Sequence, residues 1–276
     1  MYSFFPFFVL YWFLLEVYGV RDVIQTKNEV LSAQSMYVVK GNALIQKSRY
    51  SLSLTEQKAI LFMISKIKPT DKPFTEYTFA IKDFCRACNF DEGGGFYIRY
   101  VRECINTLAK NVIVIDLGDK KTLTTHWFSS AIIDGENNTV QIVFDKNITP
   151  YLYELHSFYT QYSLEYVLPM KSKYGIRLYE YLRSIQSKGW KQKISLEELR
   201  ERVDCDKYPN YKDFRRNVLE PAIEDINAFT DLDVSFEALK TGRKITHIEF
   251  IIRTYVDRDM TMDRFYNRRK VLGSIR

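Results

Sequence analysis

The stretch that decides the fold is residues 196–220, which read LEELRERVDCDKYPNYKDFRRNVLE. Its first part, Leu196–Val203, has the apolar spacing of a short helix, and Ser195 with Glu198 predicts a capping box at its start. A polar turn follows, and from Tyr211 a longer helix pattern carries apolar residues on one side and basic residues on the other. The order of short helix, turn and longer basic helix is that of a helix-turn-helix.

The same pattern occurs earlier in the chain. Ile81–Arg86 is followed by a Gly-rich turn and then by a basic helix pattern from Tyr97 to Leu108. In each copy, strand-like alternation comes next around a polar turn, Asp134–Asn138 in the first and Lys240–Lys244 in the second. Helix, turn, basic helix and hairpin form a winged helix, so we predict an α+β fold with tandem winged-helix domains that form a pseudo-repeat.

The predicted organisation has four segments. They are an atypical apolar N-terminal extension (1–35), the first winged helix (36–157), the second winged helix (158–256) and a basic, flexible tail (257–276). Because no Gly- or Ser-rich linker separates the two winged helices, we expect them to lie close together, joined by a helix over Ile148–Ser157.

The N-terminal run Met1–Leu15 contains no charged residue and many aromatic ones. It is shorter than the ~20 residues that span a bilayer, Pro6 interrupts it, and no basic segment precedes it. We therefore interpret it as an upstream extension from a start codon assigned too early, with Met36 as an alternative start. A membrane-associated segment and a packed part of the fold are the two alternatives.

Charge and cysteine content narrow the function classes. The chain has 40 Lys and Arg against 34 Asp and Glu, a net charge of +6 and a pI near 8.9, which suits a polyanion partner if the positive charge is clustered. Cys85 and Cys88 form a C-x-x-C, but Cys104 and Cys205 stand alone, so a four-ligand zinc site is not expected. We predict a reduced, cytoplasmic protein without metal or cofactor.

Four groups of residues are candidate DNA contacts. The first group is Lys212, Arg215, Arg216 and Asn217. It lies at the start of the longer helix of the second copy, where Arg, Lys and Asn donors can read base edges in the major groove. Pro221 removes one backbone hydrogen bond, so we expect a kink there and a reading portion confined to about Tyr211–Glu220.

The next two groups suit contacts to phosphate. Lys240, Arg243 and Lys244 form the tip of the second hairpin, where a wing would follow the DNA backbone. Lys171 and Lys173 precede a predicted helix, so their ammonium groups and the free backbone N–H groups of the helix start could jointly hold a phosphate.

The fourth group, Arg99 and Arg102, lies on the longer helix of the first copy. The hairpin of that copy has an acidic or neutral tip, which suits a protein interface better than phosphate. For each basic residue the alternative is a solvated charged surface, and Arg216 could simply form an ion pair with Glu220 one turn on.

Enzyme classes fit the sequence poorly. His126, His156 and His247 are scattered and form no His-x-His pair, as a nicking initiator would need, and no Walker motif occurs. We predict a non-enzymatic protein.

Three motifs occur in order with the spacing of a known family. They are Asn42–Ile45 with Leu52–Gln57, Leu168–Glu180, and Tyr211–Ala222. In these stretches the chain resembles the iteron-binding plasmid replication initiators (Rep proteins), which are built from two winged helices. The resemblance runs from about Val39 to Arg253.

The resemblance implies a division of labour. The second winged helix would be the main reader of double-stranded DNA, and the first would add auxiliary DNA contacts and form the interface of a homodimer. Monomers on origin repeats would help to melt the origin and recruit the host initiator and the replicative helicase, whereas dimers would repress the protein's own promoter. Chaperones would assist monomerisation. Two alternatives are a transcription repressor without initiator activity and a winged-helix interaction scaffold tethered to a membrane by the apolar N-terminus.

Overall fold

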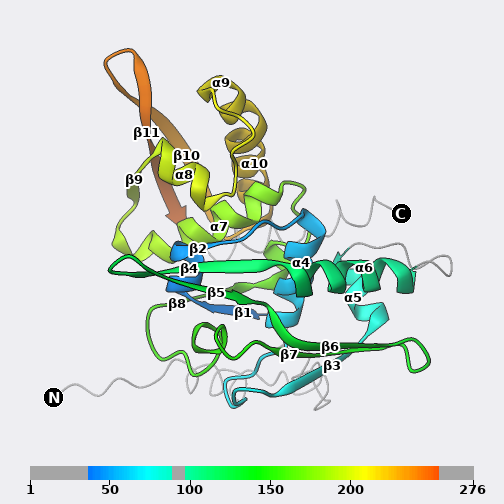
Figure 1. Cartoon of the computed structure of the whole chain (residues 1–276). Coiled ribbons are helices and arrows are strands. Elements are labelled where there is room, and N and C mark those ends of the chain that lie inside the picture. Colours follow the sequence, from blue (N-terminus) through cyan, green and yellow to red (C-terminus); the bar gives the residue numbers. More distant parts are fainter. Residues whose placement is uncertain (1–36, 89–96, 255–276) are drawn as a thin grey trace, which may run out of the picture. The chain divides into compact units, whose positions relative to one another are not determined.

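The computed structural model describes residues 37–88 and 97–254 (Figure 1), so the N-terminal extension and the whole of the predicted tail lie outside the described residues. The elements in chain order are β1 (Tyr37–Gly41), α3 (Asn42–Lys47), β2 (Ser48–Arg49), α4 (Leu54–Ile64), β3 (Glu76–Ala80), α5 (Ile81–Cys88), α6 (Tyr97–Lys110), β4 (Val112–Gly118), β5 (Lys121–His126), β6 (Phe128–Asp134), β7 (Thr139–Phe144), η1 (Thr149–Tyr151), β8 (Tyr159–Ser163), η2 (Leu164–Tyr166), α7 (Lys173–Ile185), η3 (Gln186–Lys188), β9 (Lys191–Ser195), α8 (Leu196–Arg202), α9 (Tyr211–Phe214), η4 (Arg215–Leu219), α10 (Glu220–Phe229), β10 (Leu232–Thr241) and β11 (Lys244–Thr254).

Two parts of the chain share one topology. The first repeat consists of β3, α5, α6, β6 and β7, and its strands form a sheet of order β3-β7-β6. The second repeat consists of β9, α8, α9 to α10, β10 and β11, and its sheet has the matching order β9-β11-β10. In both, a strand leads into two helices and an antiparallel hairpin pairs back onto that strand. The predicted tandem of winged helices is thus confirmed.

The first repeat contains an additional hairpin, β4–β5, between its second helix and the hairpin β6–β7. The alternation over Leu123–Ile133 predicts a single strand, but in the structure β5 pairs with β4 and β6 pairs with β7. Trp127 and Phe128 are consecutive and both buried, which the period of two in a continuous strand does not allow. The chain breaks there and changes sheet.

The expected helix over Ile148–Ser157 is wrong. The structure has only the 3-10 turn η1, followed by strand β8, which pairs antiparallel with β1. Glu154 and Phe158 have positive φ angles of 50° and 53°, which a helix does not accommodate.

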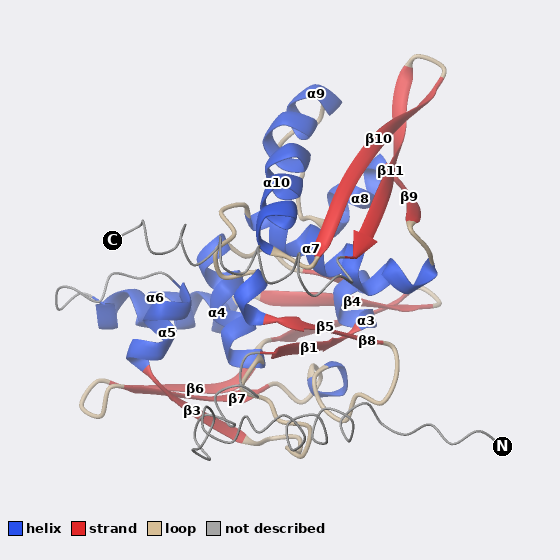
Figure 2. Cartoon of the chain, turned by 180° about the vertical axis from the view of Figure 1, so that it is seen from behind, coloured by secondary structure: helices blue, strands red, loops and turns tan. Residues whose placement is uncertain are grey.

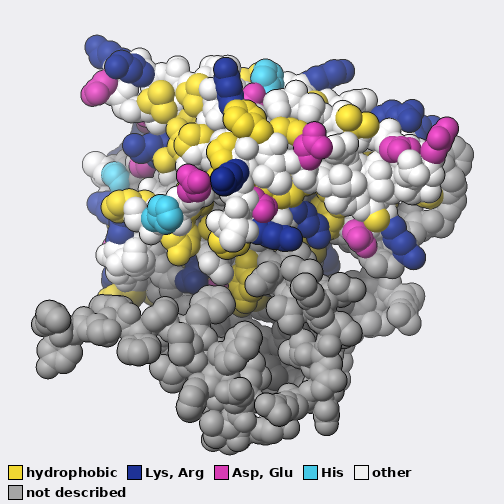
Figure 3. Space-filling model, turned by 90° about the horizontal axis from the view of Figure 1, so that it is seen from below, with side chains coloured by type: hydrophobic (Ala, Val, Ile, Leu, Met, Phe, Trp, Pro, Cys, Tyr) yellow, Lys and Arg dark blue, Asp and Glu magenta, His cyan; other side chains and the backbone are white. Residues whose placement is uncertain are grey.

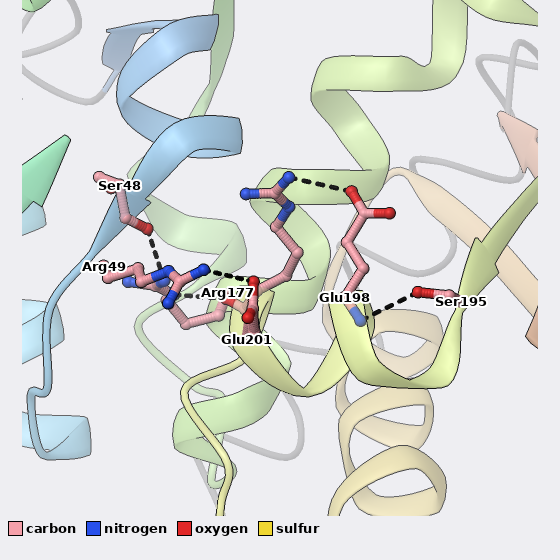
Figure 4. Close-up of polar contacts among 7 residues, drawn as sticks. Ser48, Arg49, Arg177, Ser195, Glu198 and Glu201 are labelled. Atoms are coloured by element: carbon pink, nitrogen blue, oxygen red, sulfur yellow. Dashed lines mark hydrogen bonds and ion pairs between the residues drawn. The ribbon is translucent and has the colours of Figure 1, made fainter. Parts of the chain in front are cut away.

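The capping box predicted at α8 is only half formed. Ser195 accepts a hydrogen bond from the Glu198 backbone N–H at 3.1 Å, but the Glu198 carboxylate pairs with Arg202 at 2.9 Å instead of turning back (Figure 4). A complete box exists at α4, where Ser53 and Glu56 exchange both hydrogen bonds.

Buried polar contacts join helix α7 to the N-terminal elements of the described chain. Glu180 of α7 forms a 2.6 Å ion pair with Lys40 of β1, with side chains that are 3% and 1% exposed, and it accepts a hydrogen bond from the Tyr162 hydroxyl. Arg177 lies 4.0 Å from the Tyr50 ring and donates to the backbone oxygens of Ser48 and Arg202. Figure 4 shows this region, where Arg49 also meets Glu201 of α8 at 2.6 Å.

Candidate nucleic-acid interface

The longer helix of the second repeat, α9 to α10, begins at a capped and supported point. The Asn210 side chain accepts from the Asp213 backbone N–H at 2.9 Å, which caps the helix. Arg200 of α8 stacks 4.3 Å from the buried Phe214 ring and donates to the carbonyl oxygens of Tyr208 and Pro209. These contacts fix the preceding turn against the helix start.

Just before Pro221, over Arg215–Leu219, the helix has a π-helical turn, η4. Proline has no backbone N–H, so the α-helical ladder cannot continue through this residue. The Glu220 N–H donates to the Arg215 carbonyl five residues back. The wider turn keeps Phe214, Val218 and Ala222 in the buried stripe.

The first group of predicted DNA contacts lies along this helix, and its members differ in solvent exposure. Lys212, Arg215 and Arg216 are exposed, whereas Asn217 is half-buried and donates to the Asp213 carbonyl at 2.8 Å. The ion pair suggested between Arg216 and Glu220 is wrong. Arg215 pairs with Glu220 at 2.8 Å, and Arg216 meets Asp213 at 3.4 Å.

The basic hairpin tip projects beside the helix start. Lys240, Arg243 and Lys244 are exposed, and Gly242 has a φ of 62°, which a tight turn requires and glycine adopts without strain. In both Figure 1 and Figure 2 the tip of β10–β11 and the start of α9 point to the same side of the molecule. The structure therefore brings the first two groups to one side.

The start of α7 differs from the prediction. Lys171 is exposed and the Lys173 ammonium lies 5.1 Å from the Tyr174 ring, but the backbone N–H groups of Lys171 and Ser172 donate to the Asp225 carboxylate at 2.8 and 2.6 Å. These two N–H groups, immediately before the first turn of α7, are thus not available to a phosphate.

The close approach of Asp225 depends on Gly175, where a Cβ would lie 3.3 Å from the carboxylate oxygen. Burial raises the pKa of Asp225, and the two backbone hydrogen bonds oppose that shift. Beside it, Lys171, Lys173 and Asn217 line part of a cleft of about 560 Å³.

In the first repeat, Arg99 and Arg102 are exposed on α6. Arg99 lies 3.8 Å from Glu103 and 5.5 Å from the Tyr100 ring centre. At the tip of the hairpin β6–β7, Asp134 accepts hydrogen bonds from Asn137 and Glu136, which lower its pKa. This tip is acidic, unlike that of the second repeat.

All four cysteines are buried and carry thiol groups. Burial raises the pKa of Cys104 to about 12 and also raises that of Cys88, so both favour the thiol form. Within residues 37–88 and 97–254, no group of three or more His, Cys, Asp or Glu side chains could hold a metal ion. In the same ranges, no helix is long and apolar enough to cross a membrane.

Figure 3 shows one face of the molecule, viewed from below relative to Figure 1. On the described part of this face, Lys and Arg side chains are interspersed with Asp and Glu and with apolar side chains, so positive charge does not form a continuous patch there. The tip of the β10–β11 hairpin and the start of α9 are therefore a better candidate surface for a polyanion than the face in Figure 3.

Comparison with known proteins identifies the family. Residues 37–183 match the family described as "Initiator Replication protein, WH1", and residues 195–252 match "Initiator Rep protein, WH2". The chain belongs to the initiator replication protein family. It is also 28% identical over 242 residues to a replication initiation protein from Escherichia coli, a match that covers 82% of this chain and 72% of the relative.

The fold is shared with a solved initiator. The crystal structure of the Pi initiator protein in complex with iteron DNA matches with a TM-score of 0.65 and 21% identity, over 81% of this chain and 99% of that one. The family assignment and the shared fold agree with the two repeats described above. This chain is thus a replication initiator with two winged helices.

Sequence reasoning missed several residues that shape the candidate interface. Arg200 and Phe236 contact the longer helix of the second repeat or one of its arginines, and the Asp225 carboxylate accepts hydrogen bonds at the start of α7. Pro221 signalled an irregular helix, from which the pairing of Arg215 with Glu220 could have been suspected. For Phe236, on the neighbouring strand β10, the sequence offers no signal.

Proposed function

We propose that this protein initiates plasmid replication by binding repeated double-stranded DNA sites at an origin, and that it represses its own gene. The single observation that carries the proposal is the convergence of an exposed basic helix start and a basic hairpin tip on one side of the second repeat. A winged helix uses the first in the major groove and the second along the backbone.

Under this proposal, Lys212, Arg215 and Arg216 read base edges, where a good bidentate contact discriminates by ~1–3 kcal/mol. Lys240, Arg243 and Lys244 neutralise phosphates and make affinity depend on salt. The Pi initiator, which has the same fold, was crystallised with iteron DNA, and this supports repeats as the ligand.

The first repeat would have a mixed role. Arg99 and Arg102 would contact the backbone of the other part of the site. Outside the first repeat, Lys171 and Lys173 at the start of α7 would contribute through their ammonium groups alone. The acidic tip of β6–β7 repels phosphate, which suits a protein contact such as a homodimer interface better than a DNA contact. The host initiator, the replicative helicase and chaperones are the further partners we propose.

Maintenance of a circular DNA tests initiation itself. A circle that carries the gene, its flanking DNA and no other origin should replicate, and a variant with Arg215→Ala and Arg216→Ala together should lose it. A protein that binds and represses its promoter but cannot maintain the circle would be a repressor and not an initiator.

A further inference from the structure

The π turn brings Arg215 and Glu220 together. In an α-helix, residues five apart differ by about 140° around the axis, so their side chains point to different sides. Here the i to i−5 hydrogen bond widens the turn, and the Arg215 Nε lies 2.8 Å from a Glu220 carboxylate oxygen. Pro221 thus indirectly places an acidic residue next to a candidate base reader.

A second contact restrains the same arginine. The Arg215 guanidinium lies 5.8 Å from the centre of the Phe236 ring on strand β10. The side chain is therefore held between its own helix and the first strand of the wing, yet it is still 54% exposed. Arg216 is looser, since it is 68% exposed and lies 3.4 Å from Asp213.

We infer that Glu220 is a positioning residue for DNA specificity, an inference that rests on the proposed function. By holding the guanidinium in one direction, Glu220 reduces the conformational entropy that Arg215 loses when it contacts a base. Its carboxylate also disfavours any arrangement in which Arg215 leaves to bind a phosphate, because the negative charge would then face the DNA backbone unpaired. Both effects favour the cognate site over random DNA.

The pair contributes little to folding. Glu220 is 47% exposed, and exposed ion pairs change stability only slightly. The carboxylate can therefore be removed with the helix intact, and a Glu220→Gln variant should keep the wild-type melting temperature.

The test compares Glu220→Gln with Glu224→Gln in the full chain. Glu224 is exposed on the next turn of α10, so its variant loses the same charge without the contact to Arg215. Binding is measured to the cognate repeat, to its single-base variants and to random DNA. Both variants should bind random DNA more tightly, but only Glu220→Gln should lose discrimination, by about tenfold at one base pair.

A double variant separates positioning from direct reading. If Glu220 acts through Arg215, adding Glu220→Gln to Arg215→Ala should change base discrimination no further, whereas a base contact made by Glu220 itself would add a second loss. Discrimination by Glu220→Gln equal to wild type would overturn the inference and leave the proposed function standing. A wild-type protein that distinguishes no repeat from random DNA would instead overturn the proposed function.

Discussion

The buried ion pair between Lys40 and Glu180 gives the sharpest prediction about stability. Both side chains are almost completely buried, and Glu180 has one further partner, the Tyr162 hydroxyl. Lys40→Met keeps the length of the side chain and removes its charge, so the Glu180 carboxylate stays buried with a single neutral donor. Breaking a buried pair in this way costs about 3–5 kcal/mol of unfolding free energy.

Thermal and urea unfolding, followed by circular dichroism, measure this loss. At about 2–4 °C per kcal/mol for a protein of this size, the melting temperature should fall by about 6–20 °C. The matched variant replaces the whole cluster with apolar groups, Lys40→Met, Glu180→Leu and Tyr162→Phe, and should recover most of the loss because no charge or hydroxyl is left unpaired. A loss below about 1 kcal/mol in Lys40→Met would show that water reaches the carboxylate and that the contact between β1 and α7 is not dry.

Three further predictions concern the interface and the core. Arg215→Ala should weaken binding to the cognate site by ~1–3 kcal/mol and affect binding to random DNA less. Lys244→Ala should weaken binding to the cognate site and to random DNA equally and reduce the slope of log affinity against log salt concentration by about one. Equal effects of the two variants in a fluorescence titration would refute this assignment. The four cysteines are buried, and burial raises the pKa of Cys88 and Cys104. They should therefore not react with Ellman's reagent at pH 8 until guanidinium unfolds the chain. Fast reaction in the native state would contradict their burial. Because burial raises the pKa of Asp225, its stabilising contribution is complete below the unfolded pKa of about 4 and is lost as the pH rises through the folded pKa. Asp225→Asn should therefore gain stability relative to wild type as the pH rises above about 4. A difference in urea titrations that does not depend on pH would show that burial does not destabilise the carboxylate.

Sequence patterns predicted the parts of the fold that depend on interactions between residues close together in the chain. Apolar spacing identified both helix pairs, and Ser195, predicted as a cap, accepts a hydrogen bond at the start of α8. The failures involve partners distant in sequence. The pairing of β8 with β1 joins segments more than a hundred residues apart. The interruption between β5 and β6 at Trp127 arises because Trp127 and Phe128 are both buried in the core, which the alternation of a single strand does not predict.

The candidate interface shows the same division. Basic residues at a helix start and a hairpin tip could be recognised from spacing alone, because each lies within one element. The contacts that restrain these basic residues could not be recognised from spacing. Phe236 reaches Arg215 from another strand, and the Asp225 carboxylate occupies the start of α7 from another helix. The pairing of Arg215 with Glu220 follows from a π turn, whose width the α-helical period does not anticipate.

The most direct test of the central claim is a footprint of the full chain on the DNA that flanks its own gene, with excess random competitor and across a salt series. The account predicts protection of regularly spaced repeats that persists where random DNA no longer competes. Weak, salt-sensitive binding spread evenly over all fragments would contradict it, because the basic helix and wing would then contact only phosphates.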